Sequence, residues 1–403
     1  MRGLTSEVAD VLDRRLLSAS PAPVAVALSG GGDSLALVLM AADWARAHGR
    51  DLLILTVDHR LRPESLAWTA ACAATARRLG AAFRALAWEG EKPATGLPAA
   101  ARAARHRLIA DGARQAGARV VLMGHTASDR LEAAAMRQAG ATTPSPRAWG
   151  PSPAWPEGRG VFLLRPLIGQ TRADLRAWLT ARGETWIEDP ANEDPRFARA
   201  RARLGLTGGE TDAISPADDI AELAAAATDL AGGLALPREA LHGAPHAFLA
   251  AACLCAAGTT RPPRGAGLAR LADVLKGEAP VTATLAGARI EADAGEVRFL
   301  REPGRGGVAP LVCAPGETGV WDGRLEIRAA RPVTIQALRG YAAQLPAAQQ
   351  AALRRLPAGA RGALPFIVGE GSPLLAEIPG IGVRPLASER LLAACGAVDR
   401  EPA

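Results

Sequence analysis

Short apolar runs alternate with longer mixed segments through the first half of the chain. The runs are rich in Val, Ile and Leu and predict buried strands at residues 24–28, 51–57, 81–88, 118–124 and 162–164. The segments that follow the first four runs predict helices at residues 35–47, 65–79, 98–116 and from 125 onward. Strand followed by helix, repeated in this way, implies a parallel, doubly wound sheet, so we expect an α/β fold.

Other segments complete the prediction for this first domain. Residues 1–20 predict an amphipathic helix, and the Gly-, Pro- and Ser-rich residues 139–160 predict a long loop. A further helix follows the last strand, with Thr171 and Asp174 at the spacing of a capping box and Gly183 as its stop.

The second half of the chain has a different pattern. After a predicted linker at residues 205–216, residues 218–256 are rich in Ala and Leu and predict helix. Residues 280–301 alternate between apolar and polar like a hairpin, and residues 319–335 predict further β structure. We therefore expect smaller helical and α+β C-terminal domains after the α/β domain, with domains at 1–207, 216–305 and 311–403.

Composition and charge narrow the class of partner. A chain of 403 residues is long enough for two or three domains, each with its own core. The formal net charge of +6 suits a polyanionic partner without requiring one, and nearly all of the positive charge is arginine. Aromatic residues make up only 4% of the chain, which weakens a picture of extensive base stacking.

The cysteines and the apolar content bear on the compartment. The 5 cysteines, at 72, 253, 255, 313 and 395, contain no C-x-x-C, which argues against a disulfide framework and against a zinc ribbon. No apolar run reaches the roughly 18 residues that a membrane span needs, and the first residues show no signal-peptide core. We expect a cytoplasmic protein without membrane association.

A glycine-rich turn between the first strand and the first helix is the strongest candidate for chemistry. Backbone N–H groups of consecutive glycines are unscreened, and a turn at a helix N-terminus favours an anion. A carboxylate beside a phosphate site repels the phosphate unless a divalent cation lies between them, so Asp33 is a candidate magnesium ligand. Asp33 or Ser34 is also placed to cap the helix. A plain tight turn is the alternative interpretation. The turn consists of Ser29, Gly30, Gly31, Gly32, Asp33 and Ser34.

The turn is neither a Walker A motif nor G-x-G-x-x-G, but it resembles the SGGxDS loop of the N-type ATP pyrophosphatases. Those enzymes split ATP between the α and β phosphates and place AMP on an oxygen of the substrate. The resemblance implies ATP and Mg²⁺ as cofactors, with residues 29–34 contacting the nucleotide and Asp33 holding the metal.

A second polar segment, GHTASDRLE at 124–132, follows the fourth predicted strand. On a helix, His125, Asp129 and Glu132 lie at i, i+4 and i+7 and share one face, where they suit a cation, an ammonium group or a reacting hydroxyl. A solvated polar face with a capping histidine is the alternative. The segment resembles the H-H-x-D-D-Q-x-E-T motif of the tRNA(Ile)-lysidine synthetase branch. It departs from that motif at Thr126, Ser128, Arg130 and Ala133.

Further segments resemble the same branch. Residues 57–65 resemble its V-D-H-x-L-R element, and residues 101–108 resemble its A-R-x-x-R helix, in which Arg105 is a candidate charge clamp on phosphate. An exposed helix arginine is the alternative for Arg105. Residues 165–179 and 186–203 resemble the elements that shape the amino-acid pocket and the tRNA-facing edge. In the second of these, Glu188, Asp189 and Asn192 fit an Asx turn equally well, and the arginines at 199, 201 and 203 fit a phosphate-contacting patch.

The resemblance implies a ligase that adenylates the C2 oxygen of the wobble cytidine in tRNA(Ile) with a CAU anticodon. The amine of L-lysine then displaces AMP. It further implies catalytic roles for Asp33, Arg105, His125, Asp129 and Glu132, with tRNA bound by the later domains, and it is compatible with a homodimer. The alternatives are a tRNA thiolase of the same fold, for which the first domain offers only Cys72, and a non-catalytic RNA-binding relative.

Overall fold

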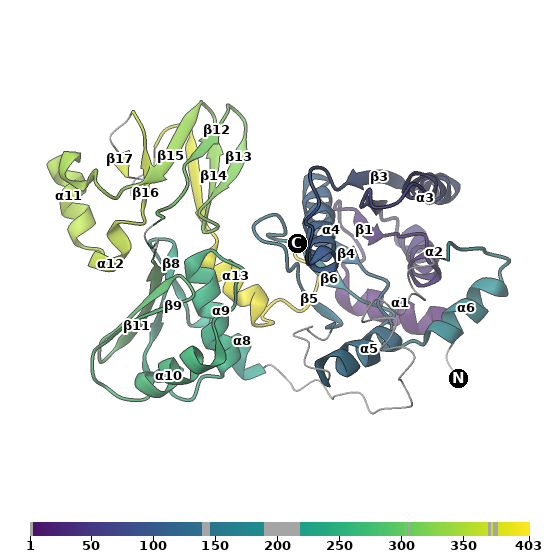
Figure 1. The fold of residues 1–403 in the computed structure, drawn as a ribbon, viewed down its shortest axis with the longest axis horizontal. Helices are drawn as coiled ribbons and strands as arrows, with labels where there is room; N and C mark the ends of the chain where they lie inside the picture. Colours follow the sequence, from purple (N-terminus) through teal and green to yellow (C-terminus); the bar gives the residue numbers. More distant parts are fainter. Residues whose placement is uncertain are drawn as a thin grey trace. The chain divides into compact units, whose positions relative to one another are not determined.

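A computed structural model describes residues 3–138, 146–188, 218–302, 304, 306–369, 372–373 and 378–403. The chain divides into two compact units (Figure 1), of which the first contains Met1–Ser215 together with Val398–Ala403 and the second contains Pro216–Ala397. The predicted linker at 205–216 lies outside the described residues. The division of the second unit into a middle and a C-terminal domain stays a prediction.

The described strands of the first unit form one six-stranded sheet. Neighbouring strands pair in parallel, except for β5 at one edge, which pairs antiparallel with β6. The predicted strands are confirmed. In spatial order the sheet contains β3 (Ala82–Ala87), β2 (Leu52–Asp58), β1 (Val24–Ala27), β4 (Val120–Leu122), β6 (Phe162–Leu164) and β5 (Trp149–Pro151).

The edge strand β5 corrects the prediction of an uninterrupted loop over residues 139–160. Its three residues pair with β6, and the ring of Trp149 stacks on that of Phe162 with centroids 5.1 Å apart. A three-residue strand that contains glycine and proline has no alternating pattern in the sequence. Only the partner strand shows where it lies.

Helices cover both faces of this sheet, as the doubly wound prediction requires. Alternate residues of β1 enter different cores, since Val24 and Val26 belong to one buried cluster and Ala25 to another. Strands buried on both faces read as continuous apolar runs, which explains the pattern in the sequence. The described helices of this unit are α1 (Leu4–Arg15), α2 (Gly32–Ala47), α3 (Ser65–Leu79), α4 (Leu97–Gln115), α5 (Ala127–Gln138) and α6 (Arg172–Thr180).

The helix starts confirm one predicted cap and overturn another. Thr171 caps α6, because its hydroxyl accepts a hydrogen bond from the backbone N–H of Asp174 at 3.1 Å. Neither Asp33 nor Ser34 caps α2, whose N-cap is Gly31 and carries no side-chain cap. The Ser34 hydroxyl instead donates to the carbonyl of Gly31 at 2.8 Å, because the glycine turn folds back over the helix start.

The second unit opens with α8 (Asp218–Ala225) and not with the continuous helix predicted over residues 218–256. A hairpin interrupts that segment. It turns at Ala231 and Gly232, both of which have positive φ, at 53° and 77°. Gly and Pro residues after the hairpin then delay the start of the next α-helix. Local turn chemistry therefore outweighs the helix preference of the Ala and Leu residues. The hairpin and the following helices are β7 (Thr228–Leu230), β8 (Gly233–Pro237), η2 (Glu239–Leu241), α9 (His246–Ala257) and α10 (Gly265–Leu275).

The predicted hairpin at residues 280–301 is a three-stranded meander, because the chain turns back a second time. Its strands extend the β7–β8 hairpin into a described sheet of five antiparallel strands. Helix α9 packs on this sheet, with Cys253 and Cys255 fully within the core, as predicted. The meander consists of β9 (Val281–Leu285), β10 (Ala288–Ala292) and β11 (Glu296–Arg301).

The remaining described strands of the second unit form two small antiparallel sheets. One contains β12 (Leu311–Cys313), β15 (Val333–Ala337), β16 (Pro365–Ile367) and β17 (Ser372–Pro373). The other contains β13 (Thr318–Trp321), β14 (Leu325–Ala329) and β18 (Ile381–Pro385). The accompanying helices are η3 (Ala342–Gln344), α11 (Ala347–Arg354), α12 (Ala358–Arg361) and α13 (Ala387–Ala394).

The last residues of the chain belong to the first unit. The Glu401 carboxylate pairs with Arg50 at 2.8 Å and accepts from the backbone N–H of Leu17 at 2.8 Å, while the Trp149 indole donates to the carbonyl of Val398 at 2.7 Å. Both side chains of the Arg50–Glu401 pair are only 1% exposed. A buried pair of this kind ties the end of the chain into the core of the first unit.

All five cysteines are free and buried, which confirms that the chain has no disulfide framework. Among the described residues, no helix is long and apolar enough to span a membrane.

Candidate active site

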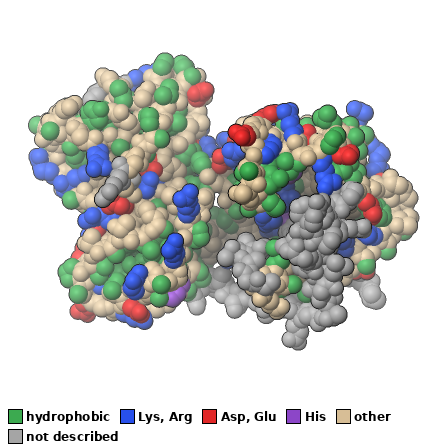
Figure 2. Space-filling view, in the orientation of Figure 1, with side chains coloured by type: hydrophobic (Ala, Val, Ile, Leu, Met, Phe, Trp, Pro, Cys, Tyr) green, Lys and Arg blue, Asp and Glu red, His purple; other side chains and the backbone are tan. Residues whose placement is uncertain are grey.

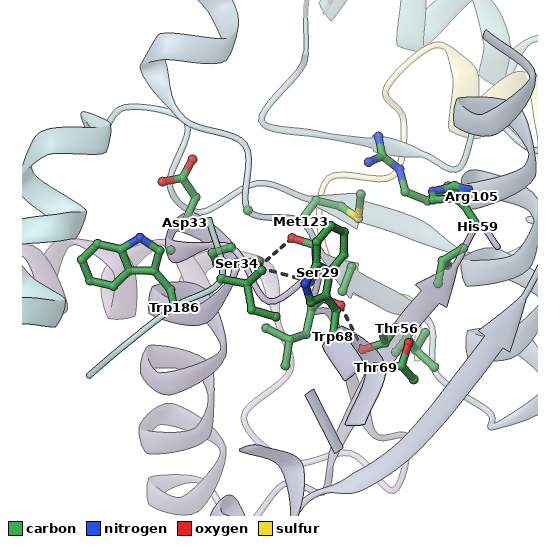
Figure 3. A pocket seen from close by; sticks show the side chains of 18 of the residues that line it. Ser29, Asp33, Ser34, Thr56, His59, Trp68, Thr69, Arg105, Met123 and Trp186 are labelled. Carbon is green, nitrogen blue, oxygen red and sulfur yellow. Dashed lines mark hydrogen bonds between the residues drawn. The ribbon is translucent and has the colours of Figure 1, made fainter. Parts of the chain in front are cut away.

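A cavity of about 670 Å³ lies at the carboxyl ends of β1, β2 and β4, where open α/β sheets bind their ligands. Figure 3 shows the side chains that converge on it from these strand ends and the adjacent helices. Of the predicted catalytic and nucleotide-binding residues, Gly30 and Glu132 are not part of its lining. The others line it together: Ser29, Gly31, Gly32, Asp33, Ser34, Arg105, His125 and Asp129.

The three glycines of the turn differ in what surrounds them. Gly30 has φ +85°, and a Cβ there would lie 2.5 Å from Cδ1 of Ile187. A Cβ on Gly32 would lie 3.4 Å from the ring of Trp186, whereas one on Gly31 would meet nothing nearer than the Ser29 hydroxyl at 3.6 Å. The turn therefore needs glycine at position 30 for its backbone conformation, and its open side is at Gly31.

Residues 186 and 187 cover the turn, a role that the sequence did not reveal. The backbone N–H of Ile187 donates to the carbonyl of Gly30 at 3.0 Å, and Figure 3 shows Trp186 beside Asp33. In the sequence, these two residues begin the segment 186–203, which is singled out by its resemblance and not by any contact with the turn. Their packing on a distant glycine turn is a tertiary contact that no local pattern signals.

Hydrogen bonds brace the turn from within. Ser34 Oγ accepts from the backbone N–H of Ser29 at 3.2 Å and lies 3.1 Å from Ser29 Oγ, and Thr56 donates to the carbonyl of Leu28 at 2.9 Å. Gly124 lets the end of β4 approach closely, because a Cβ there would lie 3.0 Å from Cα of Ser34. The shape of the turn is thus preset before any ligand arrives, which lowers the cost of binding.

An arginine joins the turn to the acids of α5. Arg172 Nε donates to Asp33 at 2.8 Å, its Nη1 donates to Glu132 at 3.2 Å, and its Nη2 lies 3.6 Å from Asp129. The Glu132 side chain is 1% exposed, whereas that of Arg172 is 23% exposed and lines the cavity. Burial raises the pKa of Asp33, and the hydrogen bond from Arg172 opposes that rise.

His125 does not share a helix face with Asp129 and Glu132, because α5 begins only at Ala127. This corrects the predicted three-residue face, although His125 and Asp129 still reach the same cavity. Asp129 Oδ2 accepts from the backbone N–H of Thr126 at 2.8 Å, so a tight turn separates His125 from the helix. Asp129 and Glu132, three residues apart, both lie on the helix near Arg172.

The protonation state of His125 follows from its surroundings. Its Nδ1 accepts a hydrogen bond from Arg165 Nε at 3.1 Å. Burial, followed by the charge of Arg165, lowers the pKa of His125 to about 3. The imidazole is therefore neutral near pH 7, with its proton on Nε2, which makes it a hydrogen-bond donor at that atom.

Arg105 lies at the other end of the cavity. Figure 3 shows it next to His59 and away from Asp33. Burial, followed by the charge of Arg105, lowers the pKa of His59. The cavity is thus divided into an acidic end near Asp33 and a basic end near Arg105, as a site for a polar, partly anionic ligand requires.

The remaining candidates contribute less. Arg60 forms an exposed ion pair with Glu89 at 2.6 Å, and Asp58 accepts from the backbone N–H of Arg60 at 2.8 Å, in agreement with a capped turn. Glu188 is exposed and pairs with Arg176 at 3.4 Å. Asp189, Asn192 and the arginines at 199, 201 and 203 lie outside the described residues.

A match to a family model defines the class of this protein. A family model described as the PP-loop domain matches residues 4–208, which is more than half of the chain. The chain therefore belongs to the PP-loop family of ATP-binding proteins, in agreement with the glycine turn at the head of its parallel sheet.

Curated relatives narrow this class. A tRNA(Ile)-lysidine synthase from Caulobacter vibrioides is 50% identical, covering 98% of each chain. A tRNA(Ile)-lysidine synthase from Rhizobium meliloti is 34% identical, covering 79% of this chain and 76% of the relative. Within the PP-loop family, the chain is thus a member of the tRNA(Ile)-lysidine synthases.

Solved structures give a weaker likeness. A U34-tRNA thiolase from Methanococcus maripaludis, solved with its [4Fe-4S] cluster, has a TM-score of 0.41 and 14% identity. The match covers 50% of this chain and 70% of the thiolase.

Proposed function

We propose that this chain joins L-lysine to the wobble cytidine of tRNA(Ile) that carries a CAU anticodon. In the first step, the C2 oxygen of the cytidine attacks the α-phosphorus of ATP, the Pα–O–Pβ bond breaks, and pyrophosphate leaves. In the second step, the ε-amine of lysine attacks C2, the bond to AMP breaks, and the amine loses a proton. The observation that carries the proposal is the cavity lined by both the glycine turn and Asp129, in a chain of this family.

The glycine turn is proposed to hold the departing pyrophosphate. Gly31 faces open space in the cavity, so phosphate oxygens can approach its backbone. The turn also lies at the N-terminus of α2, whose dipole favours negative charge. Because the turn is already braced by Ser29 and Ser34, its N–H groups are oriented before charge develops.

The residues at the acidic end fit a magnesium ion shared with the nucleotide. Among the described residues, no group of three or more His, Cys, Asp or Glu side chains is arranged to hold a metal by itself. Asp33 nevertheless presents a carboxylate to the cavity, and Mg²⁺ is commonly held by one or two carboxylates together with substrate phosphates. When bound, Mg²⁺ would neutralise charge on the phosphates.

The other roles are assigned by position and charge. Asp129 lines the cavity and is a candidate to orient the lysine amine and accept its proton. His125 is neutral and suits donation of a hydrogen bond from Nε2 to the cytidine or a phosphate, which refines its predicted role in the acidic group. Arg105, at the basic end, is a candidate clamp on the adenylated intermediate.

The tRNA body is proposed to bind through phosphate contacts. Figure 2 shows arginine and lysine side chains spread over the visible face of both units, a distribution suited to recognition of an RNA backbone by shape and charge. The proposal also includes a cytoplasmic location and is compatible with a homodimer.

Sulfur transfer, the rival activity, is less supported than lysidine formation. The curated relatives described above are lysidine synthases. In addition, Cys72 is buried at 2% exposure, and burial raises the pKa of its thiol, so it is a poor nucleophile in this state. Labelling separates the two activities, because radiolabelled lysine, and not radiolabelled sulfur, is expected to enter the tRNA.

The direct test is ATP–pyrophosphate exchange with a CAU-anticodon tRNA, with and without lysine. Asp33→Ala is expected to abolish exchange while tRNA binding stays within about twofold of the wild type. Asp43→Ala is the matched control, since Asp43 lies on the same helix but forms an exposed pair with Arg46. Equal loss of exchange and of tRNA binding in Asp33→Ala would contradict the metal role of Asp33. Absence of lysine incorporation by the wild type would overturn the proposed function itself.

A further inference from the structure

Three carboxylates converge on one guanidinium at the acidic end of the cavity. Arg172 contacts Asp33 and Glu132 at hydrogen-bond distance and lies within ion-pair distance of Asp129. Asp33 comes from the glycine turn, while Asp129 and Glu132 come from α5. A single side chain therefore links the proposed metal ligand, Asp33, to the proposed amine-handling residue, Asp129.

Glu132 lies behind this arginine. Its side chain is 1% exposed and does not line the cavity, whereas Arg172 does. An incoming amine cannot reach the Glu132 carboxylate while the guanidinium lies between them. Either Glu132 stays out of contact with the amine, or Arg172 moves when the amine binds.

The position of Arg172 favours movement. It is the first residue of α6, where the helix dipole disfavours a positive charge, so the three acids hold the guanidinium there against the field of its own helix. Its long side chain is partly exposed at the cavity wall and has several rotatable bonds, so another rotamer can carry the guanidinium elsewhere. Exchange of a guanidinium for an ammonium group also leaves the charge beside Asp129 and Glu132 unchanged.

We propose that Arg172 is a resident cation, which occupies the acidic end of the cavity and is displaced by the ammonium group of lysine. This inference rests on the proposed function and explains how its site would select lysine over other amino acids. A ligand that brings its own positive charge replaces the charge of the guanidinium beside the three carboxylates, whereas a neutral ligand does not. An amino acid with a neutral side chain would have to leave Arg172 in place, which keeps the subsite closed.

The test is direct binding of L-lysine to the full-length protein, measured by calorimetry in the absence of ATP and tRNA. Arg172→Gln removes the competing cation, so the dissociation constant for lysine is expected to fall about tenfold, as for a site that is closed nine-tenths of the time. Norleucine, with the same chain but no ammonium group, is expected to gain nothing. Where wild-type binding is too weak to measure, binding that becomes measurable in Arg172→Gln supports the proposal, and its absence in both overturns it.

Arg182→Gln is the matched control. Arg182 follows α6, lies over the ring of Trp178 at 3.7 Å from its centroid and is not part of the cavity lining, so its removal changes the charge without opening the acid group. The dissociation constant for lysine is expected to stay within about twofold of the wild type. An equal gain in both variants would show a general effect of charge and would overturn the displacement mechanism.

Two other outcomes also overturn the proposal. Weaker lysine binding in Arg172→Gln would make Arg172 a positioning residue that stays in place. A lower melting temperature with an unchanged dissociation constant would make its role structural. Should Arg172→Gln fail to fold, Arg172→Lys keeps the charge but cannot bridge three carboxylates, and it is expected to tighten lysine binding severalfold. Lysidine formation by the wild type is scored separately, so failure of this inference is distinguishable from failure of the proposed function.

Discussion

Gly30 and Gly31 are neighbours in one turn, yet alanine is expected to lower stability at the first position and to weaken ATP binding at the second. At Gly30 the backbone has φ +85°, where an L-residue is strained, and the new Cβ would lie 2.5 Å from Ile187 Cδ1. At Gly31 the backbone is extended, with φ −71° and ψ 157°, and the nearest atom to a Cβ is 3.6 Å away. Gly30→Ala should therefore destabilise the protein, whereas Gly31→Ala should change stability much less and obstruct the phosphates.

The magnitudes follow from the two contacts. A left-handed backbone costs alanine roughly 1–2 kcal/mol. Overpacking against Ile187 costs about 1 kcal/mol more, the lower end of the usual range, because the far end of that side chain can shift. Gly30→Ala is thus expected to lose about 2–3 kcal/mol of unfolding free energy. Gly31→Ala is expected to stay within about 1 kcal/mol of the wild type, because alanine is a poorer N-cap than glycine but restricts the unfolded chain, while ATP binding weakens tenfold or more, on the order of 1.4 kcal/mol.

The assay pairs urea unfolding with equilibrium dialysis of radiolabelled ATP on the same preparations. Ile187→Ala, added to Gly30→Ala, should recover the overpacking part and leave the backbone part, which appears as a coupling of about 1 kcal/mol in a double-mutant cycle. Equal destabilisation by Gly30→Ala and Gly31→Ala would refute the reasoning, because the two sites would then share one structural role. Full ATP binding by Gly31→Ala would show that phosphate does not approach the turn there.

Three further outcomes are expected from buried groups of the first unit. Glu401→Ala leaves the guanidinium of Arg50 buried without its carboxylate and should cost about 3–5 kcal/mol in urea unfolding, whereas a loss below 1 kcal/mol would mean that water replaces the carboxylate. Burial, followed by the charge of Arg105, lowers the pKa of His106 to about 3, so the native state stays neutral while the unfolded state takes up a proton below its pKa of about 6.5. Stability should therefore fall as the pH drops through that window; between pH 7 and pH 5 the loss from His106 is about 2 kcal/mol, and His106→Gln should lack this part of the decline. The Cys72 thiol should react with a disulfide reagent in the native protein far more slowly than in urea, and rapid native labelling would contradict its burial.

Much of the first unit could be predicted because its signals are local. The central strands are continuous apolar runs, since both faces of the sheet are covered, and the glycine turn follows the first of them directly. The Thr171 cap depends on residues three apart, so the sequence alone reveals it. Failures occurred where two local signals competed: Ala/Leu content predicted helix over residues 218–256, but Gly and Pro placed a hairpin inside it.

The site was predicted in its residues and not in its arrangement. Helical spacing placed His125 on the same face as Asp129, but the helix starts two residues after His125, because the Asp129 carboxylate bonds to Thr126 and closes a turn there. Nothing in the sequence singled out Arg172 within residues 165–179, and nothing in it showed that Trp186 and Ile187 would cover the glycine turn. The contact of Arg172 with Asp33 and those of Trp186 and Ile187 with the turn join residues more than a hundred positions apart, where spacing carries no information.

The sequence by itself determined the class of this protein. Alternation of buried strands and helices, with a glycine turn and an acid at the first strand's end, specifies a parallel sheet with an anion site, because each feature depends on neighbouring residues. The tertiary structure alone decided which charges face one another. Only folding places the Arg172 guanidinium among Asp33, Asp129 and Glu132, and only folding buries Glu401 on Arg50 from the far end of the chain. Charge pairing depends on distance in space, and the order of residues along the chain does not encode that distance.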